Sequence, residues 1–423
     1  MKRIAQKSGN GKRKIEDVAR QLVEGGLDVK VELIQSLIPI GLLYVNEVLQ
    51  SEVCALAGER YSRSGTPKRH VRWGSESGYV YLGGCRVPMD APRVRDREAG
   101  KTGFPDSYRA LQEPRGLDAK VLARLLGGLS CRRYEESAEL VPGALGISSS
   151  SVSRKFVKES AKALEEFCRR PLEGIDIVAI FIDGKTFAGD QMVVALGVDM
   201  EGRKVPLGFT QTATENAKSC AEFLSGLVGR GLKCDEGILF IIDGSKGLHK
   251  AVKDVFGDKA VVQRCQWHKR ENVVSYLNKG QQATFRKKLQ NAYNKPGYKE
   301  AKAAVEHVGK ELKLVNESAL ASLNEGLEET LTIHRLGLFD KLGTSFKTTN
   351  CIESLNSQIG RLTGRVSHWK NSNQKHRWLA TALMDIEPRL KRVKGFKFLP
   401  LLRQAIKREI ENKDDRKAEM SAA

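Results

Sequence analysis

Two aspartates follow apolar runs in this 423-residue chain, and they lie 60 residues apart. The run Ile238–Ile242 is uncharged and β-branched, and it ends at Asp243; the run Ile175–Ile182 is similar and ends at Asp183. A glycine follows each aspartate. Each run predicts a buried strand. A carboxylate at the end of such a strand lies at the rim of the sheet, where α/β folds bind their ligands.

Two strand ends of this kind can bring both carboxylates side by side. Two unshielded carboxylates repel each other and one of them takes up a proton, so a divalent cation is the expected partner of the pair. For either Asp-Gly pair alone, a turn after a strand is the simpler interpretation. For the two pairs together, metal binding is favoured.

A third carboxylate, Glu353, lies on a predicted helix. Asn350 is expected to cap this helix, whose inward stripe is formed by Ile352, Leu355, Ile359 and Leu362. Glu353 is one residue away from that stripe, beside Asn356 and Gly360. We therefore expect its side chain to reach the edge of the core rather than open solvent.

These residues require a sheet with helices around it. The predicted order is three strands in a meander, a helix, then strand, helix, strand and helix: Ile175–Ile182, Gln191–Val198, Lys204–Thr210, Asn216–Leu227, Ile238–Ile242, Lys246–Phe256, Ala260–Gln263 and Trp267–Leu277. This is the order of elements in the ribonuclease-H-like fold. The stretch Gln281–Leu331 is polar and strand-free, which predicts a helical insertion before the α/β unit resumes with the helix of Glu353.

The chain is therefore expected to have six segments. They are a basic region of mixed helix and strand at 1–110, a helix-turn-helix segment at 111–170, the first part of an α/β core at 171–280, a helical insertion at 281–340, the last part of the core at 341–388, and a basic C-terminal tail at 389–423. The tail either contacts nucleic acid or forms a solvated end.

Composition narrows the class of protein. A formal charge of +20 and a pI of about 9.6 predict a polyanionic partner, and nucleic acid is the favoured one. The eight cysteines include no Cys-x-x-Cys pair, which indicates reduced thiols in a cytoplasmic protein. No apolar run approaches the ~20 residues of a membrane span, so no membrane partner is expected.

The first part of the chain contains candidate DNA-binding segments. Met1–Arg20 is a basic arm, Val31–Leu49 is helical with further helix to Ala57, Tyr79–Val87 predicts a small strand or hairpin, and Arg93–Glu98 predicts a charged connector. The segment around Gly146 reads as a helix-turn-helix. Its second helix is predicted to begin at Ser148 and to present a DNA-binding face: Ser149, Ser150, Ser153, Arg154, Lys155 and Lys158.

Cys265 and His268 lie on either side of Trp267, directly after the predicted strand Ala260–Gln263. They supply half of a zinc site, but a structural zinc site has four ligands, and only a partner such as Cys351 would extend the set. We favour a structural or DNA-contacting role. Trp267 is predicted to stack on an exposed base, and the neighbouring cations are predicted to hold phosphates: His268, Arg264, Lys269 and Arg270.

Together, four motifs carry a family resemblance: Phe181-Ile-Asp183-Gly-Lys, Asp243-Gly-Ser-Lys-Gly-Leu, Gln263-Arg-Cys265-Gln-Trp-His268-Lys-Arg-Glu-Asn272 and Thr349-Asn350-Cys-Ile-Glu353. In these residues and their order, the chain resembles the Mutator-type transposases of bacterial insertion sequences. The segment from Arg132 to Arg154 is similar to the stretch that precedes the catalytic core in that family.

The resemblance implies a DDE transposase. Its triad would be Asp183, Asp243 and Glu353, in a ribonuclease-H-like core interrupted by a helical insertion, and Cys265 and His268 would be the family's Cys-x-x-His pair. The three carboxylates would bind two Mg²⁺ ions, for which Mn²⁺ can substitute. The expected partners are terminal inverted repeats, target DNA and further copies of the chain in a homodimer or higher oligomer. The expected location is the bacterial cytoplasm, at the nucleoid.

Two other functions compete with this one. A DNA-binding regulator derived from such an enzyme, with an inactive core, would have no use for the three carboxylates. A ribonuclease or junction resolvase could share the fold. The long insertion and the helix-turn-helix before the core favour the transposase.

Overall fold

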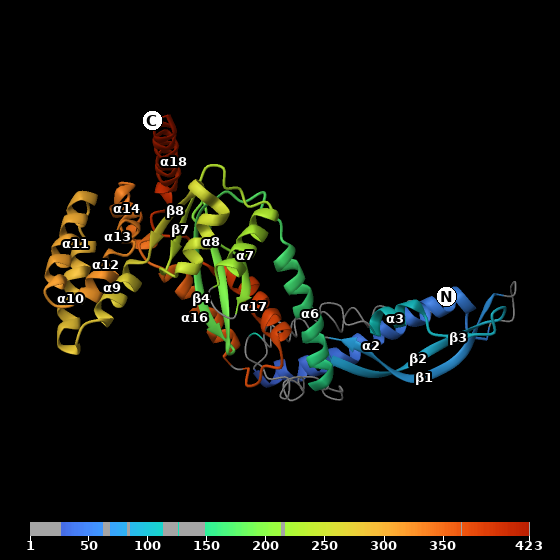
Figure 1. Ribbon diagram of the computed structural model, residues 1–423. Coiled ribbons are helices and arrows are strands. Elements are labelled where there is room, and N and C mark those ends of the chain that lie inside the picture. The colour runs from blue at the N-terminus through green and yellow to red at the C-terminus, as the bar shows by residue number, and fades with distance from the viewer. Residues whose placement is uncertain are drawn as a thin grey trace. The chain divides into compact units, whose positions relative to one another are not determined.

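The computed structural model describes residues 27–61, 68–82, 85–112, 126, 149–212, 216–364 and 366–422 (Figure 1). The chain divides into two compact units, Met1–Glu159 and Ser160–Ala423. The six segment boundaries expected from the sequence stay predictions. Among the described residues, no helix is both long and apolar enough to cross a membrane.

A five-stranded sheet forms the centre of the second unit. Its strands run in the order β6-β5-β4-β7-β8. The β4, β5 and β6 strands pair antiparallel, whereas β4, β7 and β8 pair in parallel. The bounds are β4 Ile177–Phe187, β5 Asp190–Asp199, β6 Lys204–Thr212, β7 Ile238–Ile242 and β8 Ala260–Arg264. All five predicted strands are present, and the predicted bounds of β7 are confirmed.

The bounds predicted for β4 are wrong at both ends. The strand begins at Ile177 instead of Ile175, and it does not end at Asp183 but continues to Phe187. Asp183 pairs with Val194 of β5, and the two strands are joined by a tight turn whose residues Ala188 and Gly189 both have positive φ. Because β5 pairs with β4 along this whole length, the glycine after Asp183 lies within a strand instead of ending it.

Helices cover both faces of this sheet (Figure 1). The side chains of Ile180, Ile182 and Phe240 pack with α7 (Ala217–Gly229) and α8 (Lys246–Phe256). The alternate residues Phe181 and Ile241 pack instead with α16 (Asn350–Thr363), α17 (Ser372–Ile386) and α18 (Leu399–Ala422). Since successive side chains of a strand point to opposite faces, the two cores follow directly from the apolar runs.

The helices α7 and α8 each begin where a side chain caps the first turn. The side chain of Asn216 accepts a hydrogen bond from Lys218 N at the start of α7, and the side chain of Ser245 accepts one from Leu248 N at the start of α8. The predicted bounds of α8 are confirmed, and α7 extends two residues beyond its predicted end at Leu227.

Seven helices lie between β8 and α16: α9 Gln266–Ser275, α10 Lys279–Tyr293, α11 Tyr298–Lys313, α12 Glu317–Asn324, α13 Leu327–Thr330, α14 Thr332–Arg335 and α15 Phe339–Phe346. The range 216–364 is fully described, and it contains no strand between β8 and α16. Most of these helices share a core of their own, built around residues such as Leu289, Val305 and Leu323. The helical character predicted for Gln281–Leu331 is confirmed.

The C-terminal segment is more than a solvated tail. After the short 3-10 helices η3 (Glu387–Arg389) and η4 (Phe396–Phe398), α18 buries Leu399, Leu402 and Ile406 against the sheet. Arg403 is also buried and donates hydrogen bonds to the main-chain oxygens of Gly237 and Ile177. The expectation of a solvated end is therefore wrong for the first half of α18.

The first unit contains α2 (Leu27–Ala57), α3 (Asp106–Gln112) and a sheet of β1 (His70–Leu82), β2 (Cys85–Asp96) and β3 (Thr102–Gly103). Its core includes Val45, Leu49, Val80, Ala91 and Tyr108. The predicted helix through Ala57 is confirmed, and so is a hairpin at Tyr79–Val87, although the hairpin is much longer than predicted.

The charged connector predicted at Arg93–Glu98 is wrong, because β2 continues to Asp96. The prolines of β2 suggest a break in the strand. Both Pro88 and Pro92 nevertheless pair with β1, and the other neighbour, β3, pairs only with Val94 and Arg95. An edge without a further strand accepts proline, because no partner needs its missing N–H group.

The second helix of the predicted helix-turn-helix is present as α6 (Ser149–Arg169). The preceding helices and the turn fall outside the described residues, apart from Leu126. Val152 and Phe156 of α6 are buried, while Ser153, Arg154 and Lys158 are exposed. The exposure predicted for Ser153, Arg154 and Lys158 is thus confirmed, and the helix-turn-helix itself stays a prediction.

Candidate active site

The two aspartates occupy equivalent positions on neighbouring parallel strands. The β4–β7 ladder ends at the pair Phe181 and Ile241, and Asp183 and Asp243 each lie two residues further along. By the alternation of side chains they belong to the face of Phe181 and Ile241, which is the face covered by α16. Two partly buried carboxylates therefore lie at the same edge and on the same face of the sheet.

Asp243 is held by the turn that leads into α8. Its Oδ1 accepts a hydrogen bond from Ser245 N at 3.0 Å, and Gly244 between them has a φ of +113°, which favours glycine. Asp243 also lines a polar cavity of about 170 Å³ together with Lys269, Asn272, Tyr276 and other residues from the helical segment.

Glu353 lies in the first turn of α16, where a negative charge is favoured by the helix dipole. The N-cap of α16 is Thr349, so the prediction that Asn350 caps the helix is wrong. Thr349 Oγ1 donates a hydrogen bond of 2.8 Å to Glu353 Oε1. The predicted stripe is confirmed, with Ile352, Leu355 and Ile359 buried and Leu362 partly buried. The Glu353 side chain is 42% exposed, in agreement with a place at the edge of the core.

A second side chain of α16 joins this helix to β4. Asn356 Nδ2 donates a hydrogen bond to Asp183 Oδ2 at 3.0 Å, and Lys185 Nζ donates one to the main-chain oxygen of Asn356 at 2.6 Å. Asp183 and Lys185 are two residues apart on the strand, so they share the face that α16 covers. The helix that carries Glu353 is thus fastened directly beside Asp183.

Cys265 and His268 are joined to Glu353 through Thr349. Cys265 is fully buried and is the N-cap of α9. Its Sγ accepts hydrogen bonds from His268 N at 3.5 Å and Thr349 N at 3.4 Å, and it lies 3.4 Å from Thr349 Oγ1. Thr349 Oγ1 also lies 3.3 Å from His268 Nδ1, and His268 Nε2 lies 3.9 Å from Glu353 Oε1.

These contacts determine the charge of the histidine. The hydrogen bond with Cys265 and the charges of Cys265, Asp243 and Glu353 raise the pKa of His268 to about 9, although burial opposes the change. Burial would raise the pKa of Cys265, but its hydrogen bonds with His268 and Thr349 bring that pKa below its usual value. His268 is therefore an imidazolium at neutral pH, placed between the carboxylates of β7 and α16.

The residue types fit a site for hard divalent cations. Carboxylate oxygens are the preferred ligands of Mg²⁺, and Asn356 Oδ1, next to Asp183, is a buried acceptor without a hydrogen-bond donor among the described residues. The described ranges contain no group of three or more His, Cys, Asp or Glu side chains close enough to hold one ion. The zinc alternative stays a prediction, and the Cys351 thiol donates a hydrogen bond to Ser345 O.

Three cations that the sequence predicts as DNA contacts are used inside the protein. Arg264 is buried and pairs with Glu329, Lys269 is buried and donates to the main-chain oxygens of Ser322 and Glu325, and Arg270 donates to Glu271 and Gln290. Their predicted role at phosphates gains no support from these positions.

The remaining predicted DNA contacts are more accessible. Trp267 is 45% exposed beside His268, and their rings pack edge to face at 4.8 Å. Ser153 and Arg154 are exposed on α6 and Lys155 is partly exposed, while the Ser149 side chain lies outside the described residues. Their contact with DNA stays a prediction.

Sequence reasoning missed the roles of Thr349, Asn356 and Lys185. Each lies within or just after a motif that was recognised for its carboxylate. The available signal was spacing: Lys185 is two residues from Asp183 on a strand, and Asn356 is three residues from Glu353 on a helix, so each shares a face with the carboxylate.

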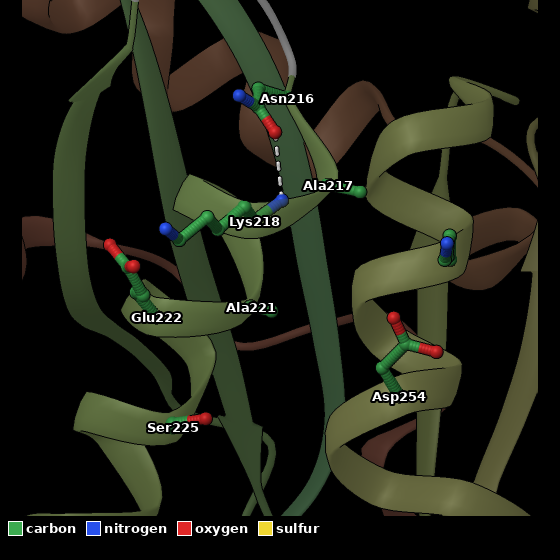
Figure 2. Close-up of a pocket in the computed structure, with 8 residues that line it drawn as sticks. Asn216, Ala217, Lys218, Ala221, Glu222, Ser225 and Asp254 are labelled. Carbon is green, nitrogen blue, oxygen red and sulfur yellow. Dashed lines mark hydrogen bonds between the residues drawn. The ribbon is translucent and has the colours of Figure 1, made fainter.

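A larger hollow, of about 720 Å³, lies between α7 and α8, which cover the face of the sheet opposite to α16 (Figure 2). It is lined by small residues such as Ala217, Ala221 and Ser225 and by charged residues such as Glu222 and Asp254. None of the predicted site residues lines it.

Comparison with known proteins gives a family match over most of the chain. The family described as "Transposase, Mutator family" matches residues 14–392. The transposase for insertion sequence element IS905 of Lactococcus lactis is 26% identical over 81% of this chain and 86% of its own length. The transposase for IS406 of Burkholderia multivorans is 25% identical over 88% of this chain and 94% of its own length. The transposase for IS256 in transposon Tn4001 of Staphylococcus aureus is 25% identical over 71% of this chain and 77% of its own length.

Proposed function

Because this chain belongs to the Mutator family of transposases, we propose that it is a DDE-type DNA transposase. In this proposal it binds the terminal inverted repeats of an insertion sequence, cleaves the DNA strand at the ends, and joins those ends to target DNA. The catalytic core would be ribonuclease-H-like, since the strand order β6-β5-β4-β7-β8 with three antiparallel and then parallel strands is the order of that fold.

One observation carries the proposal. Asp183 and Asp243 each lie two residues beyond the last pair of the β4–β7 ladder, on the face covered by α16, the helix of Glu353. A sheet edge with two adjacent carboxylates gains nothing in packing from their charges. A helix that adds a third carboxylate on the same face supports a site that binds divalent cations.

Asp183, Asp243 and Glu353 would hold the cations, Mg²⁺ or Mn²⁺. When bound, two such ions activate the attacking hydroxyl or water and stabilise the leaving oxygen of a phosphodiester in an in-line displacement. The protein's own residues keep the ligands in place: Asn356 holds Asp183, Ser245 holds Asp243, and Thr349 holds Glu353.

The positive charge of the His268 imidazolium would serve the same site. It lies 3.9 Å from Glu353 and interacts with Asp243, so it reduces the repulsion between carboxylates on two different elements. Its partly exposed ring and the exposed Trp267 beside it would then face a DNA strand that enters the site. A cation and an aromatic ring are the two features by which proteins bind single-stranded nucleic acid.

The charge of the chain supports DNA as the substrate. A net charge of +20 would give a large non-specific affinity for duplex DNA. The exposed face of α6, with Arg154 and Lys158, would contribute to recognition of the terminal repeats.

The test is strand cleavage of a terminal-repeat duplex in the presence of Mg²⁺. Asp183→Asn, Asp243→Asn and Glu353→Gln should each abolish cleavage and joining while leaving binding to the ends within a few-fold of the wild-type protein. Asp254→Asn is the matched control, because Asp254 is an exposed carboxylate on α8, away from this face of the sheet.

Two results would contradict the proposal. Near-normal cleavage by any of the three variants would remove that residue from the triad. Tight binding to the ends without cleavage by the wild-type protein, with either Mg²⁺ or Mn²⁺, would favour a DNA-binding regulator with an inactive core.

A further inference from the structure

Asn356 is a buried polar side chain in contact with one of the proposed metal ligands. It is 5% exposed, and its Nδ2 donates a hydrogen bond of 3.0 Å to Asp183 Oδ2. A buried amide in the interior of a helix is unfavourable for packing unless its polar atoms have partners. The position of Asn356 therefore needs an explanation beyond the apolar stripe of α16.

The spacing along α16 places this amide next to Glu353. Residues three apart lie on neighbouring positions of one helix face, so Glu353 and Asn356 both point toward the edge of the sheet where Asp183 lies. Lys185 of β4 donates to the main-chain oxygen of Asn356 as well. The side chain and the main chain of Asn356 are thus both bound to the strand that carries Asp183.

The other end of the amide is unsatisfied. Asn356 Oδ1 is buried and has no hydrogen-bond donor within the described part of the chain. A buried acceptor left without a donor costs about 1–3 kcal/mol. A cation bound to Asp183 carries water molecules, and such a water could donate to Oδ1 while the amide N–H group holds the carboxylate.

We propose that Asn356 is a positioning residue of the metal site, which orients Asp183 through Nδ2 and accepts a hydrogen bond from cation-bound water through Oδ1. This inference rests on the function proposed above. Residues that hold a metal ligand in this way usually change metal affinity by 10–100-fold when they are removed. An aspartate at this position would lose the donor, and a serine would be too short to reach Asp183.

The experiment measures Mn²⁺ binding to the full-length protein without DNA, by calorimetry or by the paramagnetic resonance signal of free Mn²⁺. Asn356→Ala should raise the Kd for Mn²⁺ by about 10–100-fold. The Mn²⁺ concentration for half-maximal strand cleavage should rise by a similar factor, and saturating Mn²⁺ should restore most of the rate. Asn356→Ser provides a second variant if the alanine variant does not fold.

Two further variants make the result interpretable. Thr363→Val is the matched control, since Thr363 is also a buried polar residue of α16, but its hydroxyl donates only within the helix, to Ile359 O. It should leave the Kd for Mn²⁺ unchanged. Asp183→Asn removes the proposed ligand itself and should abolish the binding event.

The outcomes separate this inference from the proposed function. An unchanged Kd in Asn356→Ala and Asn356→Ser, with binding lost in Asp183→Asn, would overturn the role of Asn356 and leave the metal site intact. An unchanged Kd in Asp183→Asn as well would overturn both. An equal loss in Thr363→Val would overturn the inference too, because it would show a general effect of packing in α16.

Discussion

Lys269 provides a direct test of whether the cations after β8 serve the fold or the DNA. It is 4% exposed, and its ammonium group donates hydrogen bonds of 2.7 Å to Ser322 O and Glu325 O at the C-terminal end of α12. Burial lowers the pKa of Lys269 below its usual range. The ammonium group of this α9 residue thus caps the C-terminal end of α12 and joins the two helices. We therefore expect Lys269→Met to destabilise the second unit.

The size of the effect follows from the two bonds. A hydrogen bond to a charged group is worth about 1.5–3 kcal/mol, and methionine avoids part of the loss because it has no ammonium group to desolvate. We expect a net loss of about 2–4 kcal/mol. In a unit of this size each kcal/mol lowers Tm by about 2–4 °C, so Tm should fall by roughly 8 °C.

Thermal unfolding followed by circular dichroism measures this change in Tm. DNA binding at several salt concentrations tests the alternative, that Lys269 contacts a phosphate. A lysine that contacts a phosphate contributes about 0.9 to the slope of log affinity against log salt concentration, whereas Lys269→Met should leave that slope unchanged. The matched control is Lys246→Met, since Lys246 is 84% exposed and its pair with Glu325 at 3.6 Å is a weak surface ion pair. An unchanged Tm together with a slope reduced by about 0.9 would refute the structural role of Lys269.

Four further predictions follow from the same structure. Arg154→Ala on the exposed face of α6 should weaken binding to terminal-repeat DNA more than to random DNA, and an unaltered footprint would remove α6 as a reader of the ends. Trp267→Ala should cost about 1–3 kcal/mol of affinity for pre-cleaved ends with unpaired bases, and an equal loss on intact duplex would argue against stacking. Thr349→Val, which removes the hydroxyl that donates to Glu353 and lies beside Cys265 Sγ, should slow strand cleavage without changing end binding; wild-type rates would show that the hydroxyl is dispensable. Burial would raise the pKa of Glu329, but hydrogen bonds from His249 and Arg264 bring it below its usual value of 4.5. The stabilising effect of Glu329 is therefore present above about pH 4.5 and is lost as pH falls through the lower folded pKa. The Tm difference between wild type and Glu329→Gln should shrink in acid, and a constant difference would contradict this.

The motifs identified the family from the sequence alone, and the family match confirms that resemblance. The elements predicted best are those with a clear start and end of their own. The strand Ile238–Ile242 is an uncharged run between glycine and aspartate, and Lys246–Phe256 follows a serine cap with apolar residues at helical spacing. Neither depends on a distant partner for its bounds.

The errors have the opposite character, because they depend on pairing partners that the local sequence does not show. The strand β4 continues past Asp183 only because β5 pairs with it, and β2 passes through two prolines because one of its edges is mostly unpaired. The predicted DNA contacts of Arg264 and Lys269 stay untested, but the sequence shows their charges and not their partners in the fold. Their partners, Glu329 and Glu325, lie more than 50 residues downstream.

The pair Cys265 and His268 shows how a motif can be explained by the path of the chain. The helical segment leaves the core at Gln266 and returns at Lys347, and Gln266 N donates a hydrogen bond of 3.0 Å to Lys347 O. Directly beside this junction, Thr349 N donates to Cys265 Sγ. The two ends of the segment are therefore closed on each other by main-chain and thiol contacts.

A segment whose ends meet in this way can be inserted with little strain on the core, whatever its length. In this chain the closing contacts also position residues of the candidate site. Thr349, two residues after the junction, occupies the N-cap position of α16 and holds Glu353, while Cys265 caps α9 and accepts a hydrogen bond from His268 N. The spacing of Cys265 and His268 thus has a physical reason. Three residues correspond to about one helical turn, which lets the Cys265 thiol and the His268 ring both contact Thr349.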